Sequence, residues 1–358
     1  LYVGGGAISS GALSEVRLLQ EQCAIPVATT TMGKGSVDEN HPLSIGPIGY
    51  YMGTRGATKF LKPMVQEADV ILLVGNRTNQ NGTDSWTLLP ENAKYIHIDI
   101  DPMEVGRNYE ALRLVGDAKL TLAALKKALG KQDLAKRFSN RASIEDTIAK
   151  ARIAHLNEAQ DVMTSNDSPI KIERFLAELD QKLSDDHIIV ADASLSSVWL
   201  ANYIKATGKR KFLFPRGIAG LGWGLPMAMG AKIAKPVQKV FCLTGDGGFA
   251  HVWSELETCK REGINVVVAV INNEILAYQK LAEQARWGRN TNACDLTPVD
   301  HVAVAEACGV KGIRVDSPDQ IAAALDEAFA AEGSVIIDLI ADPHNVPPIP
   351  FMGILENV

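Results

Sequence analysis

Residues 243–273, LTGDGGFAHVWSELETCKREGINVVVAVINN, decide the fold of the second half of the chain. An apolar run from Val240 ends in the glycine-rich turn 245–248, an amphipathic segment predicts a helix over about residues 250–262, and a second apolar run ends in Asn272–Asn273. Two strands joined by one helix form a β-α-β unit with parallel strands. Both strands therefore end at the same edge of the sheet, where open α/β folds bind ligands.

Polar residues and glycines gather at this predicted edge. Asp246 and Asn273 can each offer a hard oxygen to one Mg²⁺, whose shell is usually completed by water and substrate phosphates. Gly245, Gly247 and Gly248 let backbone N–H groups approach a diphosphate without a Cβ in the way, and the helix start adds positive potential. The alternative is an ordinary strand-to-helix turn followed by an Asn-Asn loop, because short glycine-rich motifs recur by chance.

The composition narrows the class of protein. The 358 residues are enough for two domains, and 46% hydrophobic with 22% charged residues is ordinary for a soluble protein. The net charge of −6 argues against a surface for nucleic acid or anionic membranes. No apolar run is long enough to span a membrane. Five scattered cysteines without CxxC spacing predict no disulfide framework and a reducing compartment, the cytoplasm.

Alternating strand and helix patterns predict an α/β fold of two doubly wound parallel-sheet domains joined by a helical connector. The first domain is expected over residues 1–130. Residues 131–168 are charged, rich in alanine and without a strand pattern, so we expect a helical linker whose charged runs face solvent. The second domain, residues 169–358, contains the β-α-β unit.

The second domain resembles a known family. GDG at 245–247, then 24 residues, then NN, resembles the thiamine diphosphate-binding motif. Residues 169–345 resemble the diphosphate-binding domain of the pyruvate-type thiamine enzymes, which include acetolactate synthase, pyruvate oxidase and benzoylformate decarboxylase. The loop 215–226, PRGIAGLGWGLP, resembles the family's loop on the pyrimidine side, and 192–197, DASLSS, sits where the family places a loop that contacts the diphosphate.

This resemblance implies a role for individual residues. Asp246 and Asn273 would bind the metal through their side chains, and Ile275 through its carbonyl. The residues expected at the diphosphate are Ser194, Ser196, Gly245, Gly247, Gly248 and Phe249, the last three through their N–H groups.

Two further residues would act on the cofactor ring. Leu221, 25 residues before Asp246, matches the bulky apolar residue under the thiazolium, which bends the cofactor, and the carbonyl of Ala219 would hold its amino group. On periodicity alone, without the resemblance, the interpretation of Leu221 is an ordinary core leucine.

The first domain resembles the central domain of the same group through VGGG at 3–6, TMGKG at 31–35 and HIDIDP at 97–102. That domain holds FAD in acetolactate synthase and pyruvate oxidase and ADP in oxalyl-CoA decarboxylase, and it is empty in several decarboxylases. The expected contacts with FAD or another adenine nucleotide are Gly5, Gly6, Gly75, Arg77, Asp99 and Asp117. Ordinary turns between strands and helices are the alternative.

The chain also departs from the acetolactate synthase pattern. Residues 76–86 keep Arg77 but lack the acidic, arginine-containing pattern that acetolactate synthases have in this segment. Ala282 stands where acetolactate synthases have a tryptophan that shapes the acceptor site. Family members carry an N-terminal pyrimidine-binding domain with an activating glutamate, and none precedes Leu1. The resemblance therefore implies that this domain comes from the missing N-terminal part or from another subunit, and that the chain alone is inactive.

The function implied is thiamine diphosphate- and Mg²⁺-dependent decarboxylation of a 2-oxo acid, with transfer of the carbanion to an acceptor, in a homodimer or homotetramer. Pyruvate oxidase or non-oxidative decarboxylase activity stays open, as does a cofactor-binding subunit without catalysis. A Rossmann dehydrogenase lacks support, because Gly4–Gly6 is not followed by GxGxxG spacing.

Overall fold

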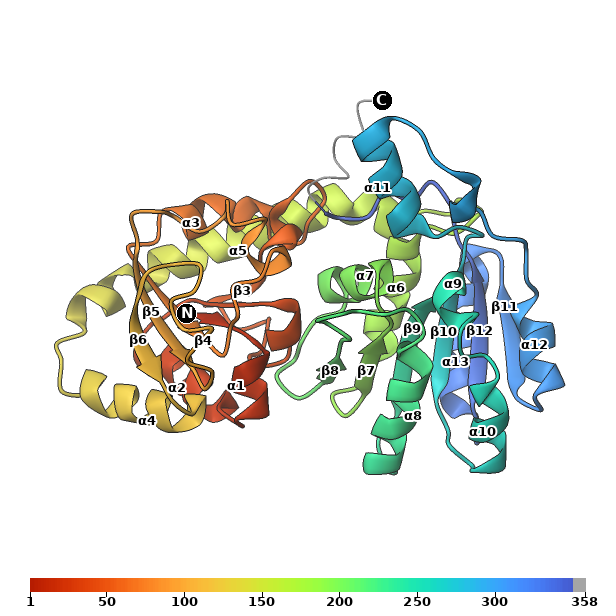
Figure 1. Cartoon of the computed structure of the whole chain (residues 1–358), viewed down its shortest axis with the longest axis horizontal. Helices are drawn as coiled ribbons and strands as arrows, with labels where there is room; N and C mark the ends of the chain where they lie inside the picture. The colour runs from red at the N-terminus through yellow and green to blue at the C-terminus, as the bar shows by residue number, and fades with distance from the viewer. Residues whose placement is uncertain (350–358) are drawn as a thin grey trace. The chain divides into compact units, whose positions relative to one another are not determined.

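The computed structural model describes residues 1–349, which fall into two compact units. The first comprises Leu1–Glu158 with Lys205–Lys209, and the second Ala159–Ile204 with Arg210–Pro347. Each unit contains a six-stranded parallel sheet between helices (Figure 1). The predicted fold class, α/β with two doubly wound parallel sheets, is confirmed.

The first sheet has the strand order β3-β2-β1-β4-β5-β6, and every neighbouring pair is parallel. Its strands are β1 (Tyr2–Val3), β2 (Val27–Thr29), β3 (Ser44–Pro47), β4 (Val70–Val74), β5 (Lys94–Asp99) and β6 (Ala111–Val115). The order reverses between β1 and β4. A crevice between the loops that follow these two strands is the ordinary ligand position in such a sheet.

Helices cover both faces of the first sheet. One face packs against α1 (Gly5–Ser9), α2 (Leu13–Gln22) and α4 (Ala118–Leu129), and the other against α3 (Lys62–Gln66) and α5 (Ala135–Met163). The predicted connector is thus a long helix, α5, that buries Ile148 on the first sheet. Its charged residues do not all face solvent, because Arg152 donates to the carbonyls of His41 (2.9 Å) and Ser44 (2.6 Å).

The second sheet has the order β11-β12-β10-β9-β7-β8, again parallel throughout. Its strands are β7 (Ile188–Ala191), β8 (Lys211–Leu213), β9 (Val240–Gly245), β10 (Val267–Asn272), β11 (Lys311–Val315) and β12 (Val335–Ile340). The order reverses between β7 and β9. The expected β-α-β unit is present, with β9 and β10 as parallel neighbours.

The second sheet is also covered on both faces. The helices α8 (Gly224–Ala234), α10 (Glu255–Arg261) and α12 (His301–Ala307) pack on one face, and α6 (Ile172–Lys182), α7 (Leu195–Tyr203) and α13 (Ile321–Ala330) on the other. Two more helices, α9 (Asp246–Phe249) and α11 (Ala277–Trp287), follow β9 and β10. Within residues 1–349, no helix combines the length and apolarity needed to cross a bilayer.

Several element boundaries differ from the sequence prediction. The single helix expected over residues 250–262 is two helices, α9 and α10, because residues 250–254 form turns between them. The sequence also predicts one helix over residues 56–67, and the structure has instead a 3-10 turn at Lys59–Leu61 and the short helix α3. The sequence pattern does not predict strands β3, β6 and β8. All three lie at sheet edges, where one side of a strand has no neighbour and a continuous apolar run is not needed.

Candidate functional site

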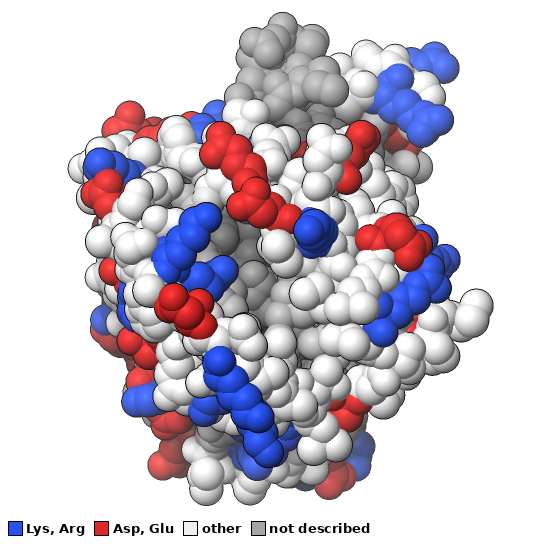
Figure 2. Space-filling view, turned by 90° about the vertical axis from the view of Figure 1, so that its left-hand side faces the viewer, with Lys and Arg blue, Asp and Glu red and all other residues white. Residues whose placement is uncertain are grey.

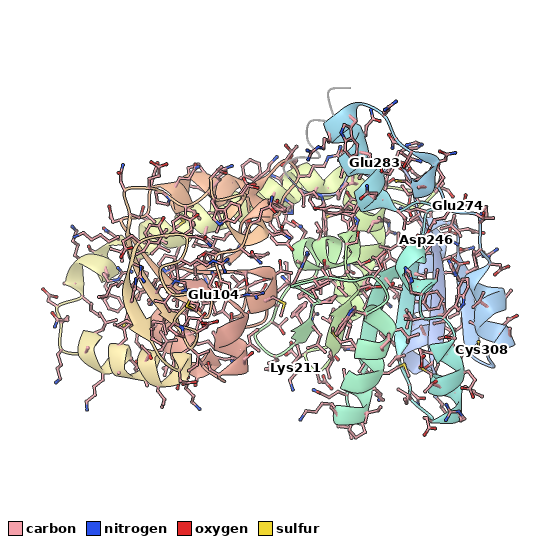
Figure 3. The ribbon with its side chains drawn as sticks, in the orientation of Figure 1. Glu104, Lys211, Asp246, Glu274, Glu283 and Cys308 are labelled. Atoms are coloured by element: carbon pink, nitrogen blue, oxygen red, sulfur yellow. The ribbon has the colours of Figure 1, made fainter. Side chains whose placement is uncertain are left out.

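Three polar residues meet at the carboxyl edge of the second sheet. Asp192 follows β7, Asp246 follows β9, and Asn273 follows β10. Figure 3 shows Asp246 and Glu274 at this end of the sheet, whereas Lys211, which begins β8, lies toward the opposite end. The sequence prediction that Asp246 and Asn273 share one edge is borne out by the parallel pairing of β9 and β10.

The carboxylate of Asp246 is held by backbone N–H groups. Its Oδ1 accepts from the N–H of Gly247 (2.7 Å), and its Oδ2 accepts from those of Asn273 (3.1 Å) and Glu274 (2.7 Å). Burial raises the pKa of Asp246 to about 6, against the opposing effect of these three amides. Glu274 has a left-handed φ of 60°, which is unusual for a residue other than glycine.

The oxygens at this position have the chemistry of a magnesium site. The carboxamide of Asn273 makes no hydrogen bond within the described chain, and Ile275 is fixed by a bridge to Asp295. No cluster of three or more His, Cys, Asp or Glu side chains in residues 1–349 could hold a metal ion. One carboxylate, one carboxamide and a backbone carbonyl, completed by outside oxygens, is a set that suits Mg²⁺ rather than a softer metal.

Asp192 links its own loop to the loop between β8 and α8 and to strand β9, a role that the sequence analysis missed. Its carboxylate accepts from the N–H groups of Ala193 (2.7 Å), Gly222 (3.0 Å) and Trp223 (3.1 Å) and from the hydroxyl of Thr244 (3.0 Å). Asp192 is almost fully buried. Buried carboxylates need such donors, so an aspartate directly after a buried strand is the signal that could have identified it.

The glycines of the turn also have a steric task. A Cβ on Gly248 would lie 2.3 Å from Oδ2 of Asp192, and one on Gly247 would lie 2.5 Å from Cδ2 of Leu276. A Cβ on Gly245 would meet no atom within 4 Å. Packing therefore requires Gly248, because Asp192 is held by its own hydrogen bonds, whereas at Gly247 the contact is with the end of a leucine side chain that can move.

The loop between β8 and α8 projects from the fold. Ala219 has a left-handed φ of 56°, unusual without a glycine. Leu221 is 38% exposed, so it is not a core leucine, and Ile218 is fully exposed. The hydrogen bonds from Gly222 and Trp223 to Asp192 fix one end of the loop.

The remaining predicted diphosphate residues lie beside these loops. Ser194 has a φ of 63°, and its carbonyl accepts from the hydroxyl of Ser197 (2.8 Å). Ser196 is buried. Phe249 is fully buried and packs edge-on against His301, with ring centroids 5.5 Å apart, so only its backbone can serve a ligand.

The carboxyl edge of the first sheet is built from glycines packed against each other. The N–H of Gly4 donates to the carbonyl of Val74 (2.9 Å), and that of Gly6 to the carbonyl of Gly75 (3.0 Å). A Cβ on Gly4 would lie 2.1 Å from the Gly75 oxygen, and one on Gly6 would lie 2.6 Å from the Gly75 Cα. The N–H of Gly6 is thus already used within the fold.

The charged residues expected to contact a nucleotide differ in whether they already make hydrogen bonds within the fold. Arg77 is exposed and has no ion-pair or hydrogen-bond partner in the described part of the chain. Asp99 accepts from the N–H of Asp101 (3.1 Å), and Asp117 caps α4 by accepting from Leu120 (2.9 Å). Arg77 is therefore free to bind an anion, whereas Asp117 already has a structural role.

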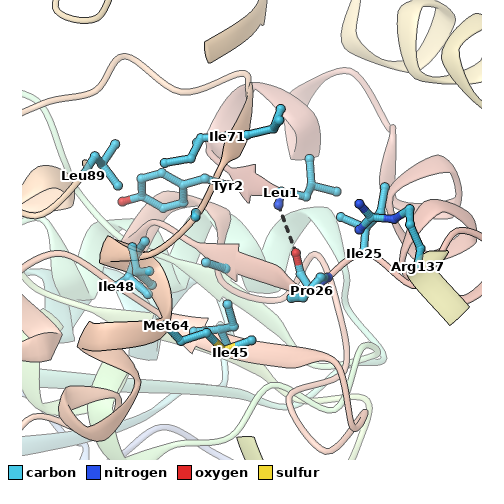
Figure 4. A pocket seen from close by; sticks show the side chains of 14 residues that line it. Leu1, Tyr2, Ile25, Pro26, Ile45, Ile48, Met64, Ile71, Leu89 and Arg137 are labelled. Carbon is cyan, nitrogen blue, oxygen red and sulfur yellow. Dashed lines mark hydrogen bonds between the residues drawn. The ribbon is translucent and has the colours of Figure 1, made fainter. Parts of the chain in front are cut away.

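A cavity of about 140 Å³ in the first unit lies elsewhere (Figure 4). Leu1, Pro26 and Val70 line it, and the N-terminal amine donates to the Pro26 carbonyl (2.9 Å). These residues lie at the amino ends of the strands, so the cavity is not at the ligand edge. The face in Figure 2 carries acidic and basic side chains of both signs without one continuous basic surface.

Two family models match the chain. Residues 1–125 match the thiamine pyrophosphate enzyme central domain, and residues 192–339 match the thiamine pyrophosphate enzyme C-terminal TPP binding domain. The chain belongs to the thiamine pyrophosphate enzymes. Thiamine pyrophosphate is the same compound as thiamine diphosphate.

Curated relatives of this thiamine pyrophosphate enzyme agree with the family match. The "Probable acetolactate synthase large subunit" of Methanocaldococcus jannaschii is 36% identical over 368 residues, covering 100% of this chain and 60% of that protein. The protein of the same name from Methanococcus aeolicus is 35% identical, covering 97% of this chain and 59% of that protein. The "Acetolactate synthase" of Mycobacterium bovis is 32% identical, covering 95% of this chain and 55% of that protein. The chain thus spans less than two thirds of these relatives' length.

Proposed function

We propose that this thiamine pyrophosphate enzyme binds thiamine diphosphate and Mg²⁺ at the carboxyl edge of its second sheet and takes part in decarboxylation of a 2-oxo acid with transfer to an acceptor, as in acetolactate synthase. The observation that carries the proposal is the carboxylate of Asp246, fixed by three backbone N–H groups beside the uncommitted carboxamide of Asn273. The bound thiamine supplies the carbanion stabilisation that such a reaction requires.

The chain's own part in this proposal is to bind and to position. Asp246, Asn273 and the Ile275 carbonyl hold the metal. The N–H groups of Gly248 and Phe249, with Ser194 and Ser196, hold the diphosphate, whereas the N–H of Gly247 already donates to Asp246. Leu221 and the Ala219 carbonyl position the ring end, which the exposure of Leu221 and the left-handed backbone of Ala219 support.

We also propose an adenine nucleotide, FAD or else ADP, at the first unit. Arg77, which has no internal partner, follows β4 at the point where the strand order reverses, as a phosphate-binding residue would. A titration followed by flavin absorbance tests this. Failure to retain added FAD or ADP would contradict it.

The proposal extends to assembly and location. The relatives from the two methanogens are named large subunits, and we propose that this chain works in a homodimer or homotetramer or beside another subunit. Its five cysteines are free in the described structure, which supports a reducing compartment such as the cytoplasm.

The test of the cofactor site compares two aspartates. Asp246→Ala should abolish calorimetric binding of thiamine diphosphate with Mg²⁺, with the fold intact by circular dichroism. Asp316→Ala is the matched control, because Asp316 follows β11 of the same sheet but is exposed. Unchanged affinity in Asp246→Ala, or equal loss in both variants, would contradict the assignment.

A further inference from the structure

Strand β12 carries a carboxylate in the middle of the second sheet. Asp338 is the one acidic residue within the six strands of this sheet, all of which lie in the described part of the chain. Its side chain is fully buried, and its neighbours along the strand, Ile336, Ile337 and Leu339, are buried apolar residues. A carboxylate in such surroundings is costly, and apolar replacements of buried ion pairs are often neutral or stabilising. Stability alone therefore does not explain Asp338.

The carboxylate of Asp338 connects the two strands on either side of β12. Its Oδ1 accepts from Nδ2 of Asn272, the last residue of β10 (2.8 Å), and its Oδ2 accepts from Nη2 of Arg314 in β11 (3.0 Å). In the register of the sheet, Asp338 pairs with Arg314 on one side and with Val270 on the other. Asn272 lies two residues after Val270, so its side chain projects from the same face as that of Asp338. Asp338 is thus placed to hold the carboxyl end of β10.

Asn272 is held by three hydrogen bonds at the point where β10 leaves the sheet. Its Nδ2 donates to Asp338 and also to the carbonyl of Val299 (3.1 Å). Its own carbonyl accepts from the N–H of Ala341 (3.0 Å). Both the side chain and the backbone of Asn272 are therefore fixed before the chain turns.

The next two residues form the turn that contacts the proposed metal ligand Asp246. The N–H groups of Asn273 and Glu274 donate to Oδ2 of Asp246 (3.1 and 2.7 Å). Glu274 has a left-handed φ, a conformation that such a residue keeps only where the surrounding contacts impose it. Asn272 is the fixed point from which this turn departs.

We propose that Asp338 is a positioning residue of the metal site: through the carboxamide of Asn272, it fixes the turn from which Asn273 approaches the metal. Its role in metal binding rests on the proposed function of the second unit, whereas its role in fixing the turn is a property of the chain itself. Removing groups that orient metal ligands typically weakens metal binding by about 10- to 100-fold. Asp338 acts one residue away from the ligand, so we expect the lower figure.

Amide hydrogen exchange in the chain without metal or cofactor tests the turn. In Asp338→Val, the N–H groups of Asn273 and Glu274 should exchange about 10-fold faster, the effect of losing one hydrogen bond to a charged group. The N–H groups within strand β10 should keep their wild-type protection. Asp338→Asn keeps an acceptor for Asn272 and should exchange as the wild type does.

Calorimetric titration of Mg²⁺ into the chain with thiamine diphosphate present tests the metal. Asp338→Val should bind Mg²⁺ about 10-fold more weakly, and Asp338→Asn should bind it nearly as the wild type does. Glu173→Met is the matched control, because Glu173 is a fully buried carboxylate of α6 in the same unit and accepts from Nδ2 of Asn345 (3.0 Å). This control should lose stability in urea without losing affinity for Mg²⁺.

A second variant tests the route through Asn272. Asn272→Ala removes the carboxamide through which Asp338 acts, so it should give the same faster exchange of the turn even if Asp338→Val fails to fold. Where both variants fold, their effects on exchange should not add in a double-mutant cycle. Additive effects would overturn the inference.

The remaining outcomes decide between a positioning role and a purely structural one. Equal acceleration of exchange in β10 and in the turn would mean that Asp338 only stabilises the sheet, and it would overturn the inference, as would unchanged exchange of the turn. Faster exchange with unchanged affinity for Mg²⁺ would overturn the role in metal binding. A wild-type chain that binds no Mg²⁺ would overturn the proposed function, and the exchange comparison would still decide whether Asp338 fixes the turn.

Discussion

The carboxyl edges of the two sheets are built on different principles. At the first sheet, Gly4, Gly6 and Gly75 pack backbone against backbone, and the N–H of Gly6 is used inside the fold. At the second, the buried carboxylates of Asp192 and Asp246 gather N–H groups from neighbouring loops.

The difference explains what each edge can bind. The close-packed glycines bring no charge of their own, and the first edge offers an anion mainly the exposed Arg77. A carboxylate held by N–H groups keeps lone pairs for a cation, and so Asp246 can present a metal to a diphosphate. Similar topology thus gives one edge suited to an anion without a metal and another suited to a metal complex.

Gly4→Ala is the substitution expected to disrupt the packing at the carboxyl edge of the first sheet most strongly. The added Cβ would lie 2.1 Å from a backbone oxygen that cannot move aside alone, so the cost should exceed the ~3 kcal/mol usual for overpacking. We expect loss of soluble folded protein. Gly245→Ala, whose Cβ meets nothing within 4 Å, is the control and should shift the melting temperature little. Equal stability of the two variants would refute the steric account.

The second edge should fail when Asp192 is removed. Asp192→Ala deletes the acceptor of four hydrogen bonds at once, and we expect about 4 kcal/mol of lost stability in urea denaturation. Thr244→Val removes a single donor of this set and should cost about 1 kcal/mol. If both variants lose the same stability, Asp192 does not act as the shared acceptor of these four hydrogen bonds.

The first unit also buries a charge, but it neutralises that charge internally. Nζ of Lys34 contacts both carboxylate oxygens of Glu39 (2.7 and 2.8 Å), and the lysine side chain is almost fully buried. Glu39→Ala would remove the carboxylate that neutralises this ammonium and should cost about 3 kcal/mol. Lys34→Met in the same background should recover part of the loss, measured by denaturation in a double-mutant cycle.

The smallest predicted effect lies at the amino end of β7, away from both ligand edges. Burial lowers the pKa of His187 from its ordinary 6.5 to about 4. The unfolded chain therefore takes up a proton before the folded one as the pH falls. Stability is fully present above pH 6.5 and is progressively lost as the pH falls toward 4. His187→Gln should flatten this part of the stability-pH curve, and an unchanged slope would contradict the assignment.

Much of the fold could be predicted because buried parallel strands have long apolar runs in their sequence. Strands β9, β10 and β12 were visible in this way, and the Asp246–Asn273 pair followed from the rule that parallel strands end together. The edge strands β3, β6 and β8 could not be seen, because they need no such run.

The site was predictable only where one residue type carries the chemistry. Asp246 and Asn273 form a recognisable pair in the sequence, whereas Asp192 gains its role from Gly222 and Thr244, which lie 30 and 52 residues away along the chain. Contacts of this kind depend on the packing of distant loops and leave no local pattern.

The central claim is that Asp246 presents a metal to a diphosphate at the second edge. Its most direct test is the affinity of the chain for thiamine diphosphate, measured by calorimetry with Mg²⁺ and again with EDTA. The account predicts weak but measurable binding by this chain with Mg²⁺ and at least about a 100-fold loss without it, since the cation offsets the repulsion between the Asp246 carboxylate and the diphosphate. Equal affinity in EDTA would contradict it.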